Sequence, residues 1–212
     1  DVISVFKLLD DKDSFRGHYA KLMTHRLLTA IGFDCRREQL VIDELSAVCG
    51  GGYTSALQRM LSDRLGSTDL TATCLGIAKT ALQNECTVIT SGSWPVNPNP
   101  YPFTWPESIA KDIDTFTNKY MAINKKRKLE WLPQLSRIEV LCDDCTLVMS
   151  AVQYAILRQL FDGPNAFVNA DSIARQSQIP VEVVAQELET AGKMGLLIVK
   201  TGANNRVGYQ VN

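Results

Sequence analysis

Apolar residues recur every three or four positions through the first third of the chain, which predicts several short amphipathic helices joined by tight connections. The pattern breaks at glycines 50–52, expected to form a left-handed C-cap and turn, and again at Gly66. Asp13, Thr54 and Asp69 stand where side-chain oxygens could accept the free N–H groups of a helix N-terminus. This part of the chain is therefore expected to form a helical bundle.

A proline-rich segment follows at residues 91–106, and its five prolines remove backbone donors and exclude helix or central strand. We expect an ordered loop or domain junction there, held against the neighbouring core by Trp94 and Trp105. Pro106 suits the first position of a further helix. The buried stripe of that helix is expected at Ile109, Ile113, Phe116 and Tyr120.

Alternating apolar residues beyond position 128 predict three short strands. They are centred on Leu129 and Trp131, on Ile138, Val140 and Cys142, and on Leu147 and Met149. Asp143 and Asp144 suit a two-residue hairpin turn between the last two strands.

Helical spacing returns at Ser150, and further helices are predicted at about 170–176 and from Pro180 onwards. A hairpin of residues 196–199 and 207–211, with its turn at 202–205, is expected to follow. Three helices and a hairpin describe a winged-helix-like element at about 150–212. The predicted fold class is α+β, with a helical bundle at residues 1–87 and an α/β domain with a small sheet at residues 88–212.

Composition narrows the classes of function. The chain has 212 residues, and its 22 basic side chains nearly balance 23 acidic ones, so no overall field attracts nucleic acid or an anionic membrane. No apolar run approaches the roughly 20 residues that span a bilayer, and we expect a soluble intracellular protein. The six cysteines are expected to be reduced thiols. The chain begins inside a helical pattern, and we expect it to be a fragment of a longer protein.

Two groups of residues are candidate sites of chemistry. Cys142 and Cys145 have zinc-ligand spacing, but no second pair of ligands exists, and small residues beside a hairpin turn explain them better. The histidines His18 and His25 belong to one predicted helix and do not complete a catalytic arrangement. We therefore expect no catalytic residue, metal or cofactor.

The helix that would enter DNA in a winged-helix protein spans about 180–194. It contains Glu182, Glu187 and Glu189 against Lys193 alone, so phosphates would repel it. Nucleic-acid binding is disfavoured, although a winged-helix nucleic-acid-binding regulator stays as the alternative hypothesis.

A basic run of four residues is the only concentrated charge, and it consists of Lys125, Lys126, Arg127 and Lys128. One interpretation is a solvated helix end, where cations complement the helix dipole. The other is a surface that attracts an acidic partner in a salt-sensitive manner.

Four sequence blocks resemble the cullins, the scaffolds of multisubunit ubiquitin ligases. They are the helix from Asp11-Lys-Asp13 through Phe15 and Tyr19 to Arg26-Leu-Leu28, then Tyr53–Met60, then Thr90-Ser-Gly-Ser-Trp-Pro95, and finally Arg127-Lys-Leu-Glu-Trp131. The resemblance covers essentially the whole chain.

The resemblance implies a non-catalytic scaffold that recruits a RING-box protein, and through it a ubiquitin-conjugating enzyme, by addition of a strand to the small sheet. An open sheet edge gives an incoming strand backbone hydrogen bonds and side-chain pockets. The expected RING-box contacts are Leu129, Trp131, Ile138, Val140, Leu147 and Met149.

Further expectations depend on the same resemblance. The basic run is the candidate surface for the conjugating enzyme, cullin-associated regulators are further partners, and the expected location is the cytoplasm and nucleus. The V-R-x-M-K-type motif that carries the family's modification lysine is absent from this chain, so no lysine is assigned to that role. A cullin-like subunit of the anaphase-promoting complex is a related alternative.

Overall fold

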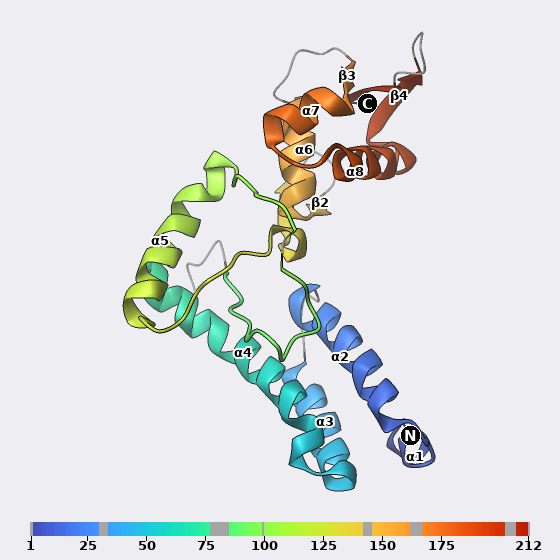
Figure 1. Ribbon diagram of the computed structural model, residues 1–212, viewed down its shortest axis with the longest axis vertical. Coiled ribbons are helices and arrows are strands. Elements are labelled where there is room, and N and C mark those ends of the chain that lie inside the picture. The colour runs from blue at the N-terminus through green and yellow to red at the C-terminus, as the bar shows by residue number, and fades with distance from the viewer. Residues whose placement is uncertain are drawn as a thin grey trace. The chain divides into compact units, whose positions relative to one another are not determined.

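The structure is a computed structural model (Figure 1). It describes residues 2–29, 34–76, 85–98, 100–141, 146–161, 167–201 and 207–211. The chain divides into two compact units, the first formed by residues 1–97 and 112–129 and the second by residues 98–111 and 130–212. Helices and small antiparallel sheets confirm the α+β class. The division expected near residue 87 stays a prediction.

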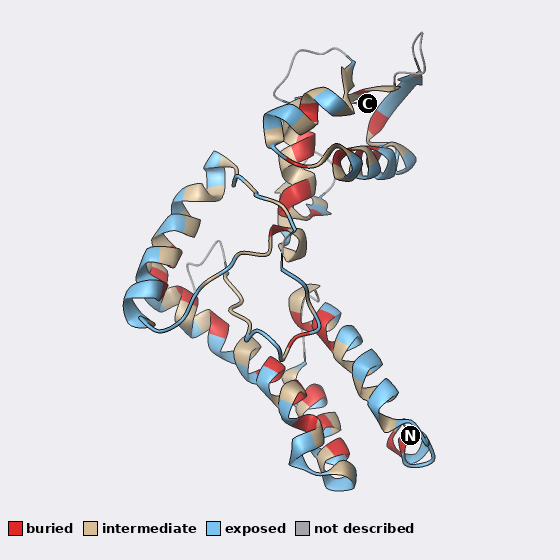
Figure 2. Ribbon diagram, viewed as in Figure 1, coloured by how far each residue is buried: buried red, intermediate tan, exposed pale blue. Residues whose placement is uncertain are grey.

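The first unit is helical, as predicted. Its elements are α1 (Val2–Lys7), α2 (Lys12–Thr29), α3 (Cys35–Cys49), α4 (Gly51–Leu75) and residues 112–123 of α5 (Glu107–Ile123). Figure 2 shows buried positions gathered where α3 and α4 run alongside each other. The fully buried side chains of this core are Phe6, Met23, Ile42, Leu45, Leu57, Met60 and Leu61.

The predicted helix break at Gly66 is wrong, because α4 continues through this residue without interruption. Thr54 and Asp69 are likewise inside α4 and do not cap a helix N-terminus. Glycine costs only about 1 kcal/mol relative to alanine inside a helix, and the buried apolar face of α4 outweighs that cost. The cap expected at Asp13 is also misplaced, since Asp11 Oδ1 accepts the N–H of Ser14 at 2.9 Å.

Gly50 separates α3 from α4 and has a φ of 84°, a region that favours glycine. Its N–H donates to the carbonyl of Ser46 at 2.7 Å and so closes the last turn of α3. Only this glycine of the triplet makes the turn, because Gly51 and Gly52 belong to the first turn of α4.

Polar side chains on one face of α4 hold residues 85–94, which are extended from 85 to 90 and then turn, and which we call the arm. Thr71 Oγ1 accepts the N–H of Cys86 at 3.0 Å, and Ser67 Oγ accepts the N–H of Val88 at 3.1 Å. Four helical residues rise about 6 Å, and two extended residues rise about 6.6 Å. The two spacings match, so every fourth residue of α4 meets every second amide of the arm.

Asp63 continues this series and fixes the end of the arm. Its Oδ2 accepts the N–H of Thr90 at 2.7 Å and the indole N–H of Trp94 at 2.9 Å, while its Oδ1 accepts the hydroxyl of Thr90 at 3.0 Å. Trp94 is only 4% exposed and belongs to the core of the first unit. The prediction that Trp94 holds the proline-rich segment against a core is confirmed.

Within its described residues, the second unit contains two separate sheets, three whole helices and residues 107–111 of α5. Its elements are β1 (Ile138–Leu141), β2 (Thr146–Met149), α6 (Ala151–Phe161), β3 (Val168–Asn169), α7 (Ala170–Ser177), α8 (Val181–Lys193), β4 (Leu197–Thr201) and β5 (Val207–Val211), with a short 3-10 helix at Pro133–Leu135. The second sheet has the antiparallel order β3-β5-β4. The predicted order of three helices and a terminal hairpin is confirmed, and the turn expected at 202–205 lies outside the described residues.

Ser150 and Gln153 form a reciprocal cap at the start of α6. Ser150 Oγ accepts the N–H of Gln153 at 3.2 Å, and Gln153 Oε1 accepts the N–H of Ser150 at 2.9 Å. The amide of Gln153 also donates to Glu187 on α8 at 2.8 Å. This pairing fixes where β2 ends and α6 begins.

Continuity of α4 can be tested by alanine substitution. Gly66→Ala should raise the free energy of unfolding by about 1 kcal/mol, since an added Cβ has open space around it. The matched variant Gly50→Ala should lower it by about 1–2 kcal/mol because its φ is positive. Urea unfolding followed by circular dichroism measures both changes, and destabilisation by Gly66→Ala would contradict a continuous α4.

The arm can be tested at Asp63. Asp63→Ala should lower the free energy of unfolding by about 3 kcal/mol, because three donors lose a charged acceptor. Ser62→Ala is the control, since its exposed hydroxyl only donates to the carbonyl of Gln58; a change within about 0.5 kcal/mol is expected. Equal effects of the two variants in urea unfolding would contradict the role of Asp63.

Candidate protein-interaction surfaces

β1 and β2 form an antiparallel hairpin whose two faces differ. Ile138 pairs with Met149, and Val140 pairs with Leu147. All four side chains pack against the hydrophobic core of the second unit. Four of the six residues predicted to bind a RING-box protein are thus brought together, but their side chains point into their own unit.

The outer face of the hairpin presents apolar residues that the sequence analysis did not select. Leu141 is 83% exposed and Val148 is 51% exposed. They lie diagonally on one face, because Leu141 pairs with Thr146 and Val148 pairs with Glu139. Strand alternation gives the signal that could have found them, since the residues between inward-facing positions must face outward.

Both edges of the hairpin lack a strand partner in the part of the chain that the structure describes, because its sheet contains β1 and β2 alone. Each edge therefore offers backbone N–H and C=O groups that a further strand could bond. An isolated two-stranded hairpin is marginal in water, but the packed inner face holds this one in place.

Leu129 and Trp131 do not form the predicted first strand. Both are half-buried and lie in a stretch without strand pairing. The strand prediction is wrong because alternation alone supplies no pairing partner, and the short 3-10 helix beginning at Pro133 changes the chain direction. Trp131 instead packs edge-on against Trp105, with ring centroids 5.7 Å apart. Trp105 in turn packs edge-on against Phe103 at 5.2 Å.

The basic run lies just beyond the C-terminal end of α5. Lys125, Lys126, Arg127 and Lys128 are all exposed. The N–H of Arg127 donates to the carbonyl of Asn124 at 2.9 Å, which makes a turn directly after the helix. None of the four cations forms an ion pair with another described residue. Their charge is therefore available to an outside group.

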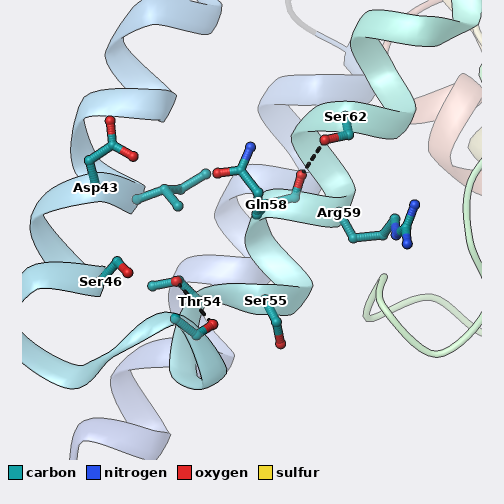
Figure 3. Close-up of a pocket in the computed structure, with 9 residues that line it drawn as sticks. Asp43, Ser46, Thr54, Ser55, Gln58, Arg59 and Ser62 are labelled. Atoms are coloured by element: carbon teal, nitrogen blue, oxygen red, sulfur yellow. Dashed lines mark hydrogen bonds between the residues drawn. The ribbon is translucent and has the colours of Figure 1, made fainter.

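A groove of about 530 Å³ lies between α3 and α4. Figure 3 shows Asp43 and Ser46 on α3 facing Thr54 and Gln58 on α4, with Arg59 pointing away. The Gln58 amide exchanges hydrogen bonds of 2.9 and 3.1 Å with Gln39, and Gln39 also donates to Asp43. Because these polar groups bond one another, we assign no ligand to the groove.

The two histidines and the half-buried Cys86 are not placed for bond chemistry. His18 and His25 are exposed and contact only groups of their own helix. Burial raises the pKa of the Cys86 thiol to about 12, so it stays protonated and is a poor nucleophile at neutral pH. No cluster of three or more metal-ligating side chains occurs among the described residues, and Cys142 and Cys145 lie outside them.

Within the same described ranges, none of the helices combines the length and apolar character needed to cross a bilayer.

Two residues of the opening sequence block, Tyr19 and Arg26 on α2, meet Glu38 on α3. Glu38 is 7% exposed, and its carboxylate accepts the Tyr19 hydroxyl at 2.6 Å and Arg26 Nε at 2.5 Å. The Arg26 guanidinium also lies 5.3 Å from the centre of the Tyr19 ring. A buried carboxylate is stable only when it is paired in this manner, so this block of the sequence serves to join two helices.

Comparison with known proteins agrees with this architecture. Residues 1–71 match the model of the cullin alpha solenoid domain, and residues 88–208 match that of the cullin alpha+beta domain. The chain belongs to the cullin family.

Individual relatives support the same conclusion. The chain is similar to Cullin-1 of Schizosaccharomyces pombe, with 32% identity over 66% of this chain and 18% of that protein. Cullin-1 of Caenorhabditis elegans is 33% identical over 66% of this chain and 18% of its own length. Cullin-1 of Dictyostelium discoideum is 28% identical over 93% of this chain. The chain spans 18–27% of the length of these relatives.

The link between α2 and α3 predicts a pH dependence. Burial, then the hydrogen bond to Glu38, raises the pKa of Tyr19 above its ordinary value of 10.0. Stability from the neutral phenol is therefore complete below about pH 10 and is lost as the pH rises further. Tyr19→Phe should cost about 1–2 kcal/mol at neutral pH.

Urea unfolding of both proteins from about pH 8 to pH 11 measures this effect. The difference in unfolding free energy between wild type and Tyr19→Phe should be constant up to about pH 10 and smaller above it. A difference that stays constant to pH 11 would show that the Tyr19 hydroxyl titrates equally in both states.

Proposed function

We propose that this chain is a non-catalytic part of the scaffold of a cullin-RING ubiquitin ligase, and that the β1–β2 hairpin recruits a RING-box protein by strand addition. The observation that carries the proposal is the two-stranded sheet with both edges lacking a strand partner among the described residues. Membership of the cullin family supports a partner of this class.

The hairpin is suited to strand addition because its side chains anchor it to the core, whereas its backbone groups would bond the partner. Ile138, Val140, Leu147 and Met149 hold it against the unit's core. The backbone edge is then free to bond a partner without unpacking any side chain. These four residues therefore support the proposed interface by anchoring the hairpin to the core. Leu129 and Trp131 precede the hairpin in the chain and are not part of it.

Scaffolding needs no bond chemistry, because holding two proteins together raises their effective concentration. The RING-box protein would bring a ubiquitin-conjugating enzyme, and the four exposed cations 125–128 would attract an acidic part of that enzyme. Cullin-associated regulators are further proposed partners, and the proposed location is the cytoplasm and nucleus.

A nucleic-acid-binding role gains less support. The order of helices and strands from α6 to β5 would suit it. However, α8 exposes Glu182 and Glu189, and Glu189 is already paired with Lys193 at 2.7 Å. A gel shift at low salt separates the two functions, because a nucleic-acid binder must shift DNA or RNA and a scaffold need not.

Strand addition predicts a local change in amide hydrogen exchange. When the full chain is mixed with a RING-box protein, exchange should slow in β1 or β2, because a row of edge amides becomes hydrogen-bonded. The edge strand β4 is the internal control and should exchange at an unchanged rate. A complex that forms with no protection in either strand of the hairpin would overturn the proposed mode of binding.

A further inference from the structure

Ile123 is an exposed apolar residue that stands between basic residues in the chain. It is the last residue of α5 and is 57% exposed. Lys119 lies four residues earlier, on the same face of the helix, and is exposed. The cations 125–128 follow after a turn that begins at Asn124. Charged groups thus stand on both sides of one uncovered isoleucine.

The turn keeps these groups close together. The N–H of Asn124 donates to the carbonyl of Tyr120 at 2.9 Å, and Tyr120 is buried. The N–H of Arg127 then donates to the carbonyl of Asn124, which makes a turn directly after the helix. The turn keeps the cations from extending away from Ile123. We call Lys119, Lys125, Lys126, Arg127 and Lys128 the α5 basic surface. None of the five forms an ion pair elsewhere in the described part of the chain.

A second exposed apolar residue, Met121, does not belong to this surface. It is 37% exposed, but residues two apart on a helix point to different sides. The structure therefore offers one apolar position next to the cations and a second one, of similar chemistry, that faces elsewhere.

We propose that the α5 basic surface binds an acidic peptide segment that carries a large apolar side chain, and that this side chain packs on Ile123. The inference rests on the proposed function, in which an acidic part of a ubiquitin-conjugating enzyme meets the basic run, and it adds a specific requirement to that partner. Carboxylates complement the five cations, and an apolar side chain removes the exposed surface of Ile123 from water.

The two parts of the contact respond differently to salt. Attraction between exposed charges is screened as ionic strength rises. Burial of apolar surface is not weakened by screening. A partner with acidic residues alone should therefore lose most of its affinity in moderate salt, whereas a partner with an apolar side chain should retain a part of it.

The test uses two fluorescent peptides that differ at one central position. Both are runs of aspartate and glutamate, one with a central leucine and the other with a central serine, and binding to the full chain is measured by anisotropy at low and moderate salt. The leucine peptide should bind about fivefold more tightly, the gain expected from burying about half of an isoleucine. Ile123→Ser should abolish this preference, and the matched variant Met121→Ser should keep it.

The charge variant Lys125→Glu with Lys126→Glu should weaken both peptides, more strongly at low salt. Equal binding of the two peptides to wild type, or a preference that survives Ile123→Ser, would overturn the apolar contact and leave the acidic partner in place. Loss of the preference in Met121→Ser as well would also overturn it. If neither peptide binds at low salt, the acidic partner itself is refuted. Hydrogen exchange of the hairpin tests strand addition separately.

Discussion

The first unit depends on the match between the rise of α4 and the rise of an extended chain. Polar side chains at 63, 67 and 71 lie on one face of the helix and accept amides at 90, 88 and 86 of the arm. Ser67 and Thr71 are fully buried, so each unmade bond would leave a polar group away from water. This arrangement needs a helix without interruption and delivers Trp94 into the core.

The second unit leaves backbone groups that a partner could bond under the proposed function. The β1–β2 hairpin uses its inner side chains for its own core and leaves its backbone edges without a strand in the described chain. A site of this kind depends on backbone groups that every sequence has, so specificity must come from the neighbouring side chains. Leu141 and Val148 on the outer face are exposed at the right place for that purpose.

Much of the fold follows from periodicity, because burial of an apolar face dominates local preference. Helices α6 to α8 and the terminal hairpin are predicted in this manner. The anchor at Trp94 is predicted from the cost of leaving a large aromatic ring in water. The missed features depend on partners distant in sequence. Gly66 resembles a helix break in the sequence because the bonds that Asp63 and Ser67 make to the arm cannot be read there. Leu129 and Trp131 alternate without a strand to pair with. The basic run was visible in sequence, but the place of Ile123 beside it needed the turn after α5.

The central claim is that the hairpin gains a strand from another polypeptide. The most direct test is an experimental structure of this chain bound to a RING-box protein. The account predicts one continuous sheet in which a strand of the partner is hydrogen-bonded to β1 or to β2. A complex in which the partner binds another surface, while both edges of the hairpin stay open to solvent, would contradict it.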